Sequence, residues 1–215
     1  MGVTGRLGGR RCLVAGRGPV ADAIAQRLRA DGGVVSRLDG EPSSLAEEAR
    51  AVEAVADVTG RLGGVDVLVT AFAEREDRPF LELDDELWER MLAENLTSAF
   101  LIGRECARAM ASAGGGVIVH VGSDVGARPG PGTAAYAAAK AGVHLLATVM
   151  GLDLAPHGVR VCAVAAAEDG SETAGGAVVP GPDAVAGAVA FCASDEASYV
   201  LSSTFFVNGP LPVRS

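Results

Sequence analysis

The sequence predicts an α/β fold with a doubly wound parallel sheet of about six strands and helices on both faces. Strand patterns and helix patterns alternate along the chain, which is typical of parallel strands joined by crossover helices. The strand candidates are short continuous apolar runs, as expected where both faces of a sheet are covered. A chain of 215 residues with 49% apolar content can bury one sizeable core. We therefore predict a single domain over residues 1–215.

Local signals place each element in order. Pro19 and Pro182 suit first helical turns, Ser44 and Glu47 form a capping-box pattern, and the glycines at 63–64 follow a helix end. Residues 166–181 show no periodicity, and we interpret them as a connecting loop or a short lid over the site. The predicted strands are 11–15, 34–38, 65–70, 117–121, 160–165 and 204–207, and the predicted helices are 19–30, 44–62, 85–113, 134–154 and 182–193.

Composition excludes several classes of function. A net charge of −9 and the absence of a basic patch exclude a nucleic-acid partner. We find no apolar run of the roughly 18 residues that a membrane span requires. The first residues lack the apolar run of a signal peptide, so we expect a cytoplasmic protein. The four cysteines are widely spaced and the three histidines isolated, which predicts buried thiols in a reducing compartment and no metal site.

The chemistry predicted by the sequence centres on Tyr136 and Lys140, which is the only lysine of the chain. Their spacing places a phenol and an ammonium on one face of a helix. The phenol of a free tyrosine has a pKa of about 10, and a nearby cation favours the phenolate and lowers that pKa. Tyr136 is therefore a candidate acid or base at neutral pH.

Two polar residues are placed to assist Tyr136. Ser123 follows a predicted buried strand and should lie at its carboxyl end, where open α/β sheets bind ligands. Its hydroxyl could donate a hydrogen bond to a substrate carbonyl. Asn95 falls on the apolar stripe of the third helix, and a buried amide there needs partners such as water or the lysine.

The four residues resemble the catalytic tetrad of classical short-chain dehydrogenases/reductases, in particular the 3-oxoacyl-carrier-protein reductase-like members. The resemblance implies a Rossmann-like fold in which Tyr136 exchanges a proton with the substrate oxygen and Lys140 assists it and binds the nicotinamide ribose. It implies that Ser123 positions the carbonyl and that Asn95 holds a relay water. The motifs that carry it are Glu-Asn-Leu-Thr-Ser-Ala-Phe, Gly-Gly-Gly-Val-Ile-Val-His-Val-Gly-Ser and Ala-Ala-Tyr-Ala-Ala-Ala-Lys-Ala-Gly.

The predicted cofactor loop differs from the family pattern. Gly16, Gly18 and Ala21 match the general dinucleotide fingerprint GxGxxG/A after the first strand, in a loop one residue shorter than the Thr-Gly-x₃-Gly-x-Gly of the family. Its glycines would let the backbone approach a pyrophosphate at the helix N-terminus. Arg17 and Val20 of the same loop complete this half of the predicted cofactor site.

The second strand bears on the choice of cofactor. Asp39 follows it at the distance where an acidic residue binds the adenosine ribose of NAD, whereas Arg37 would favour the 2′-phosphate of NADP. We expect NAD or NADP, with a lean to NAD, and no metal.

Other segments depart further from the family. Its Asn-Asn-Ala-Gly motif is replaced by residues 70–73, where we expect Ala71 and Phe72 at the cofactor and the Phe72 ring to crowd the adenosine side. Its Pro-Gly after the fifth strand is replaced by alanines at 166–167. The segment between Asp39 and Val65 has room for one helix only, so we expect one strand fewer than is usual for the family.

The sequence leaves three functions open. The first is an NAD(P)-dependent oxidoreductase that interconverts a small-molecule carbonyl and a secondary alcohol. The second is a non-redox proton-transfer enzyme such as a dehydratase, isomerase or cyclase, and the third is a non-catalytic sensor or assembly partner. The resemblance further implies a homodimer or homotetramer that packs through the two long helices, 85–113 and 134–154.

Overall fold

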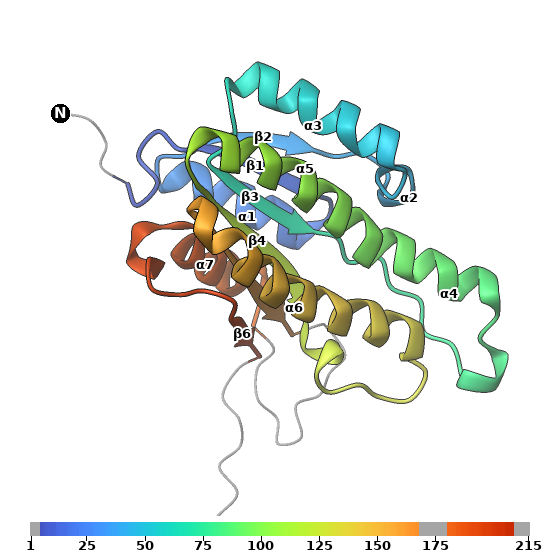
Figure 1. Ribbon diagram of the computed structural model, residues 1–215. Coiled ribbons are helices and arrows are strands. Elements are labelled where there is room, and N and C mark those ends of the chain that lie inside the picture. The colour runs from blue at the N-terminus through green and yellow to red at the C-terminus, as the bar shows by residue number, and fades with distance from the viewer. Residues whose placement is uncertain (1–4, 168–179, 209–215) are drawn as a thin grey trace, which may run out of the picture.

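The computed structural model of the protein describes residues 5–167 and 180–208. Its six strands are all parallel and lie in the order β2-β1-β3-β4-β5-β6, so the predicted Rossmann-like sheet is confirmed (Figure 1). The strands are β1 Arg11–Gly16, β2 Val34–Leu38, β3 Val67–Ala71, β4 Gly116–Ser123, β5 Val159–Ala166 and β6 Thr204–Val207. The predicted lid at 166–181 falls mostly outside the described residues.

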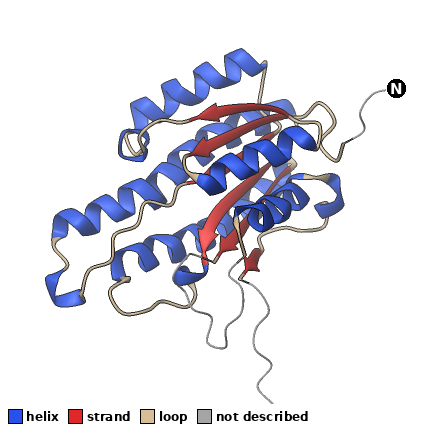
Figure 2. Ribbon diagram, turned by 180° about the vertical axis from the view of Figure 1, so that it is seen from behind, coloured by secondary structure: helices blue, strands red, loops and turns tan. Residues whose placement is uncertain are grey.

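Helices cover both faces of the sheet (Figures 1 and 2). One apolar cluster joins α1 and α7 to alternate strand residues such as Val119, and a second joins α3, α5 and α6 to the intervening ones, such as Ile118. This alternation is the side-chain period of a strand that is buried on both faces. The helices are α1 Pro19–Ala30, α2 Pro42–Leu45, α3 Glu48–Leu62, α4 Asp85–Leu92, α5 Ser98–Ala113, α6 Ala134–Leu154 and α7 Pro182–Ala193.

The order of the strands reverses at β1, whose neighbours are β2 and β3. In open α/β sheets ligands bind outside the carboxyl ends of the strands at such a switch point. Here the last paired residues of β1 and β3 are Gly16 and Ala71. Gly16 has a φ of +130°, and a Cβ at this position would lie 2.3 Å from the carbonyl oxygen of Ala71. Glycine is therefore required for the two strand ends to pack this closely.

The predicted helix 44–62 differs from the structure at its start. Pro42 begins a separate short helix, α2, so Ser44 lies inside that turn and its hydroxyl donates to the carbonyl oxygen of Glu41 at 3.0 Å. Glu47 then becomes the residue before α3. The capping-box prediction is wrong because a proline two residues earlier initiates a helical turn first.

The predicted helix 85–113 contains an irregular turn. The chain runs from α4 through a π-helical turn, η2 Ala93–Thr97, into α5. Such turns insert one extra residue into a helix and often occur at functional sites. The turn contains Asn95, one of the four predicted catalytic residues.

Helix α6 corrects the expectation that no segment is long and apolar enough for a membrane span. The helical stretch Ala134–His157 is long and apolar enough to cross a membrane, with a mean hydropathy of 1.3. Of its most apolar 18 residues, 44% are buried inside the protein. Its apolar residues divide between two sides: Val143 and Ala147 pack in the core cluster, whereas Leu145, Val149 and Leu152 are exposed. The helix packs against β4 and β5, and it carries Tyr136 and Lys140.

Candidate active site

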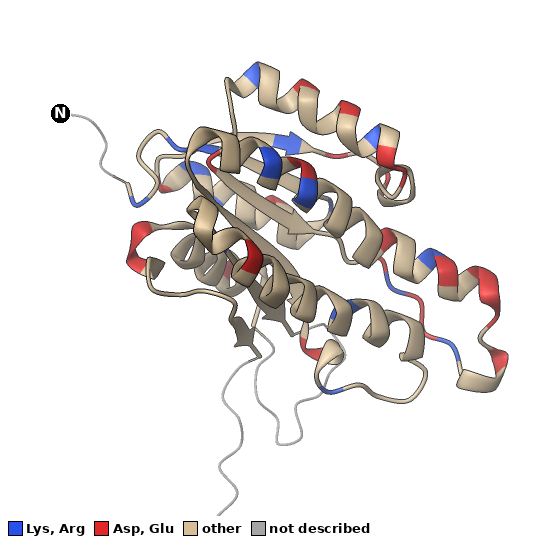
Figure 3. Cartoon of the chain, viewed as in Figure 1, with Lys and Arg blue, Asp and Glu red and all other residues tan. Residues whose placement is uncertain are grey.

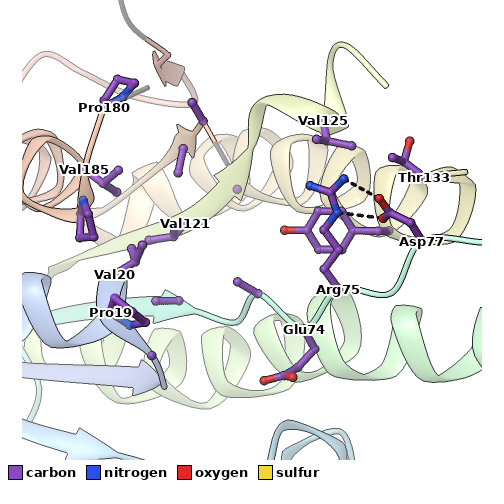
Figure 4. A pocket seen from close by; sticks show the side chains of 18 of the residues that line it. Pro19, Val20, Glu74, Arg75, Asp77, Val121, Val125, Thr133, Pro180 and Val185 are labelled. Carbon is purple, nitrogen blue, oxygen red and sulfur yellow. Dashed lines mark hydrogen bonds and ion pairs between the residues drawn. The ribbon is translucent and has the colours of Figure 1, made fainter. Parts of the chain in front are cut away.

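A cavity of about 1260 Å³ opens at the carboxyl ends of the strands (Figure 4). Its walls come from the loops that follow β1 and β3, the ends of β4 and β5, the segment before α6 and the first turn of α7. These elements meet there because all six strands run in the same direction. The predicted residues Arg17, Gly18, Val20, Ala71 and Tyr136 all line this cavity.

The loop after β1 leads into α1 through a glycine with a positive φ. Gly18 precedes α1 with a φ of +87°, and the space that its Cβ would occupy is open. Helix α1 begins at Pro19, and, as at every helix start, its first backbone N–H groups have no partners inside the helix. Such an N-terminus favours an anion.

Arg17 is held by two carboxylates at the edge of this loop. Its guanidinium lies 2.6 Å from Glu41 and 2.8 Å from Glu74. The hydrogen bonds to these carboxylates raise the pKa of Arg17 above its usual value. Arg17 therefore ties the loop to α2 and to the segment after β3.

Arg37 and Asp39 pair with each other. The Nη2 of Arg37 lies 2.7 Å from Asp39 and donates to the carbonyl oxygen of Gly16 at 2.8 Å, while its Nη1 donates to Asp22 at 2.8 Å. Neither residue lines the cavity. Arg37 therefore links the end of β1 to α1 and to the residue that follows β2.

Tyr136 and Lys140 lie together in the first half of α6. The Lys140 ammonium is 5.3 Å from the centre of the Tyr136 ring, and both residues are 1% exposed. Nζ of Lys140 donates a hydrogen bond to the carbonyl oxygen of Phe72. Tyr136 lines the cavity, whereas Lys140 lies behind it. The predicted juxtaposition of phenol and ammonium is therefore present in the structure.

The Phe72 ring does not crowd the cavity. It is 2% exposed and packs in the core cluster with Leu13 and Leu68. The side chains of Ala71 and Ala73 face the cavity instead. The expectation for the Phe72 ring is wrong because the strand alternation turns this side chain into the core.

Ser123 and Asn95 lie behind the cavity wall. Ser123 ends β4 fully buried, and its Oγ accepts the backbone N–H of Val125 at 3.1 Å. Asn95 donates through Nδ2 to the carbonyl oxygens of Glu74 at 2.8 Å and Met91 at 3.0 Å. Its Oδ1 is buried and has no hydrogen-bond partner among the described residues. A buried acceptor of this kind needs a water molecule or another donor.

Arg75 and Asp77 form a pair that the sequence did not reveal. Arg75 donates to both carboxylate oxygens of Asp77, at 2.8 and 2.7 Å, as the dashed lines of Figure 4 show. The guanidinium lies 5.6 Å from the centre of the Tyr136 ring, so a second cation flanks the phenol. The only signal in the sequence is an arginine and an aspartate two residues apart after a strand, which is too common to identify a site.

The comparisons with known proteins agree with this geometry. A family model described as short chain dehydrogenase matches residues 6–174. This chain belongs to the short-chain dehydrogenase family. It is accordingly an oxidoreductase, and the resemblance inferred from the Asn95, Ser123, Tyr136 and Lys140 arrangement is confirmed.

Relatives of this short-chain dehydrogenase include named reductases. It is 38% identical to the 3-oxoacyl-[acyl-carrier-protein] reductase of Vibrio cholerae, over 71% of its own length and 68% of that protein. It is 32% identical to the reductase of the same name in Escherichia coli, over 88% of its own length and 81% of that protein. A crystal structure of a short-chain dehydrogenase/reductase from Burkholderia xenovorans superposes with a TM-score of 0.88 at 29% identity. The superposition covers 98% of this chain and 99% of that one. These relatives favour a redox function over the two alternatives.

Proposed function

We propose that this short-chain dehydrogenase uses NAD to interconvert a carbonyl and a secondary alcohol, with Tyr136 as the proton donor and acceptor. The observation that carries the proposal is the position of Tyr136. Its ring forms part of the wall of the switch-point cavity and is flanked by the cations of Lys140 and Arg75.

The cavity fits a dinucleotide. Its volume of about 1260 Å³ exceeds the range of roughly 300–1,000 Å³ typical of small-molecule sites. Gly18 leaves open space at the start of α1, and Ala71 and Ala73 present small side chains at the end of β3. Gly18 and Val20 would approach the pyrophosphate, and Ala71 and Tyr136 would adjoin the rest of the cofactor.

The residues of the chain supply the proton chemistry. The nicotinamide cofactor, when bound, would supply the hydride as NADH in carbonyl reduction and accept it as NAD+ in alcohol oxidation. In carbonyl reduction the Tyr136 hydroxyl donates its proton to the substrate oxygen, and in alcohol oxidation the phenolate accepts that proton. The ammonium of Lys140 stabilises the phenolate through its charge because burial strengthens such interactions.

Ser123 and Asn95 complete the proposed proton chemistry. The Ser123 hydroxyl accepts one backbone N–H among the described contacts and keeps its own proton. It lies just behind the wall residues Gly122 and Val125, and we assign it the role of orienting the substrate carbonyl. The unsatisfied Oδ1 of Asn95 would hold a water molecule. Such a water gives the buried ammonium a route for proton exchange.

The charges around the adenosine end support NAD over NADP. Arg37 would have to contact a 2′-phosphate, but its guanidinium is occupied by Asp22, Asp39 and the Gly16 carbonyl oxygen. Arg17 is likewise neutralised by Glu41 and Glu74. A phosphate dianion would therefore meet an excess of carboxylates, whereas Asp39 can accept hydrogen bonds from a free ribose.

A titration of NADH and NADPH followed by nicotinamide fluorescence tests this proposal. We expect NADH to bind at least about tenfold more tightly, since one lost charge-assisted contact is worth roughly 1.5–3 kcal/mol. The double variant Asp22→Asn/Asp39→Asn removes the two carboxylates that bind Arg37. It should reduce the difference in affinity between NADH and NADPH. The proposal fails if neither nucleotide binds at millimolar concentration.

We also propose that the chain forms a homodimer or homotetramer through α4, α5 and α6. These helices expose several apolar side chains. The charged residues of α6 are Lys140 and Asp153, and most of the helix is uncharged (Figure 3). An exposed apolar surface of this kind indicates an interface. Light scattering at micromolar concentration tests it, and Leu145→Glu/Val149→Glu should yield monomers. The exposed side chains are Trp88, Phe100, Leu145, Val149 and Leu152.

A further inference from the structure

The cavity wall contains three arginines whose charges differ in how they are balanced. Arg17 pairs with two glutamates, and Arg75 pairs with both oxygens of Asp77. The third, Arg128, lies within 4.0 Å of no carboxylate in the part of the chain that the structure describes. Arg128 is therefore the cation of the cavity wall that the described residues leave unbalanced.

The position of Arg128 is fixed by other contacts. Its backbone N–H donates to the carbonyl oxygen of Asp124 at 2.8 Å, which closes a turn after β4. Its guanidinium lies 5.8 Å from the centre of the Phe206 ring on β6, and that ring packs edge-on against His144 of α6 at 5.9 Å. A guanidinium on an aromatic face keeps the N–H donors of its edge available for a planar anion.

Arg128 belongs to the part of the cavity where the substrate would bind. The phosphate loop and the end of β3 form the cofactor half of the wall. Arg128 lies in the segment that joins Ser123 to α6, and it lines the cavity together with Thr133 and Tyr136. A group bound by Arg128 would therefore belong to the molecule on which Tyr136 acts.

We propose that Arg128 binds a carboxylate of the substrate, so that the substrate is a keto acid or the corresponding hydroxy acid. This inference rests on the proposed oxidoreductase function and adds a substrate class to it. Arginine binds carboxylates through two parallel N–H···O bonds, which fixes the orientation of the ligand as well as its charge. The apolar residues Val125 and Pro131 of the same wall suit an aliphatic chain between the two polar ends.

The first test compares keto acids with their methyl esters. The probes are 4-oxopentanoate, 5-oxohexanoate and 6-oxoheptanoate, each measured beside its ester with NADH, because the length series locates the spacing between ketone and carboxylate. At the best length we expect kcat/KM for the acid to exceed that for the ester roughly tenfold, which allows for solvent screening of an exposed arginine. Arg128→Gln should reduce this ratio to about one, and Arg128→Lys should retain part of it.

Arg29→Gln is the matched control. Arg29 is an exposed arginine on α1 with no ion pair among the described residues, and it does not line the cavity. Its substitution changes the net charge equally and should leave the ratio unchanged. A ratio near one in the wild-type protein at every length, or one that survives Arg128→Gln, would overturn the inference while leaving the redox function intact.

A binding measurement separates this inference from the proposed function. Hexanoate and hexanamide are titrated into the full chain and followed by NMR, with Arg128→Gln as the comparison. We expect Arg128→Gln to weaken the binding of hexanoate and to leave the binding of hexanamide unchanged. If hexanoate binds in an Arg128-dependent way but neither NADH nor NADPH binds at millimolar concentration, the redox proposal fails and the anion site stands. If hexanoate binding does not depend on Arg128, the anion site is refuted.

Discussion

The ammonium of Lys140 donates a hydrogen bond to the main-chain carbonyl of Phe72, which ties α6 to the end of β3. Both side chains are almost completely buried. A buried ammonium is costly unless it is hydrogen-bonded, so this contact helps to stabilise the charge beside Tyr136. It also explains how a bulky residue can occupy position 72, because only its backbone serves the site.

Lys140→Met should separate the effect of the Lys140 charge on activity from the contribution of its side-chain packing to stability. Methionine is similar in length and apolar, so the helix should keep its place, at a cost of roughly 1–3 kcal/mol for the Phe72 carbonyl that loses its donor. We expect kcat/KM to fall at least about a hundredfold because the phenolate loses its stabilising cation. NADH-linked activity and the free energy of unfolding in urea provide the two measurements, and activity within twofold of wild type would contradict the role of Lys140.

Tyr136→Phe removes one oxygen from the cavity wall. We expect kcat to fall by roughly a hundredfold to ten-thousandfold, the usual contribution of a positioned acid or base. The affinity for NADH should change only a few-fold, since the ring remains. Tyr199→Phe, at the other tyrosine of the chain, is the control, because Tyr199 is exposed and outside the cavity. Equal losses in the two variants would refute a specific role for Tyr136.

The Arg75–Asp77 pair should set the pH dependence of alcohol oxidation. Asp77→Asn leaves the Arg75 charge beside the phenol without its bidentate carboxylate, which favours the phenolate and should move the half-maximal rate to lower pH. Arg75→Gln removes the cation and should move the half-maximal rate to higher pH. The pH profile of kcat/KM measures both shifts, and shifts in the same direction would show that the pair does not act through charge.

Gly16→Ala should destabilise the protein where β1 and β3 end. The new Cβ would lie 2.3 Å from the Ala71 carbonyl oxygen at a φ of +130°, so we expect a loss of roughly 3 kcal/mol or more in the free energy of unfolding. Gly60→Ala is the matched control. Gly60 lies inside α3 with open space around it, and alanine there should stabilise the helix by about 0.5–1 kcal/mol. Urea unfolding of both variants measures whether the free energy of unfolding falls in Gly16→Ala and rises in Gly60→Ala.

His120 should make stability depend on pH. It is fully buried, its Nδ1 lies 2.7 Å from the Thr70 hydroxyl, and burial lowers its pKa to about 4. The unfolded chain binds a proton near the ordinary pKa of 6.5 while the folded chain does not, so stability falls as the pH drops from 6.5 towards 4 and is unaffected above this range.

The free energy of unfolding should therefore be about 2 kcal/mol lower at pH 5 than at pH 7.5 through His120 alone. His120→Asn keeps a polar group near Thr70 but cannot titrate, so it should lack this part of the loss. Urea unfolding at the two pH values gives the difference. An equal loss of stability in both proteins would show that folding does not lower the pKa of His120.

Much of the fold could be predicted because its signals are local. Continuous apolar runs indicated buried parallel strands, and the missing unit between Asp39 and Val65 indicated six strands rather than more. The errors lie where two local signals compete, as at Pro42 and Ser44, or where a long apolar helix such as α6 resembles a membrane span. Strand alternation, which depends on the true register, placed the Phe72 ring in the core.

The sequence by itself determined the pairing of Tyr136 with Lys140, because residues four apart on a helix share a face whatever surrounds them. Only the tertiary structure decided their partners: the Phe72 carbonyl for Lys140 and the Arg75 guanidinium for Tyr136. It also turned Arg37 towards Gly16 and left Arg128 without a carboxylate among the described residues. These contacts join distant segments, and their geometry depends on how the ends of parallel strands meet, which no local pattern encodes.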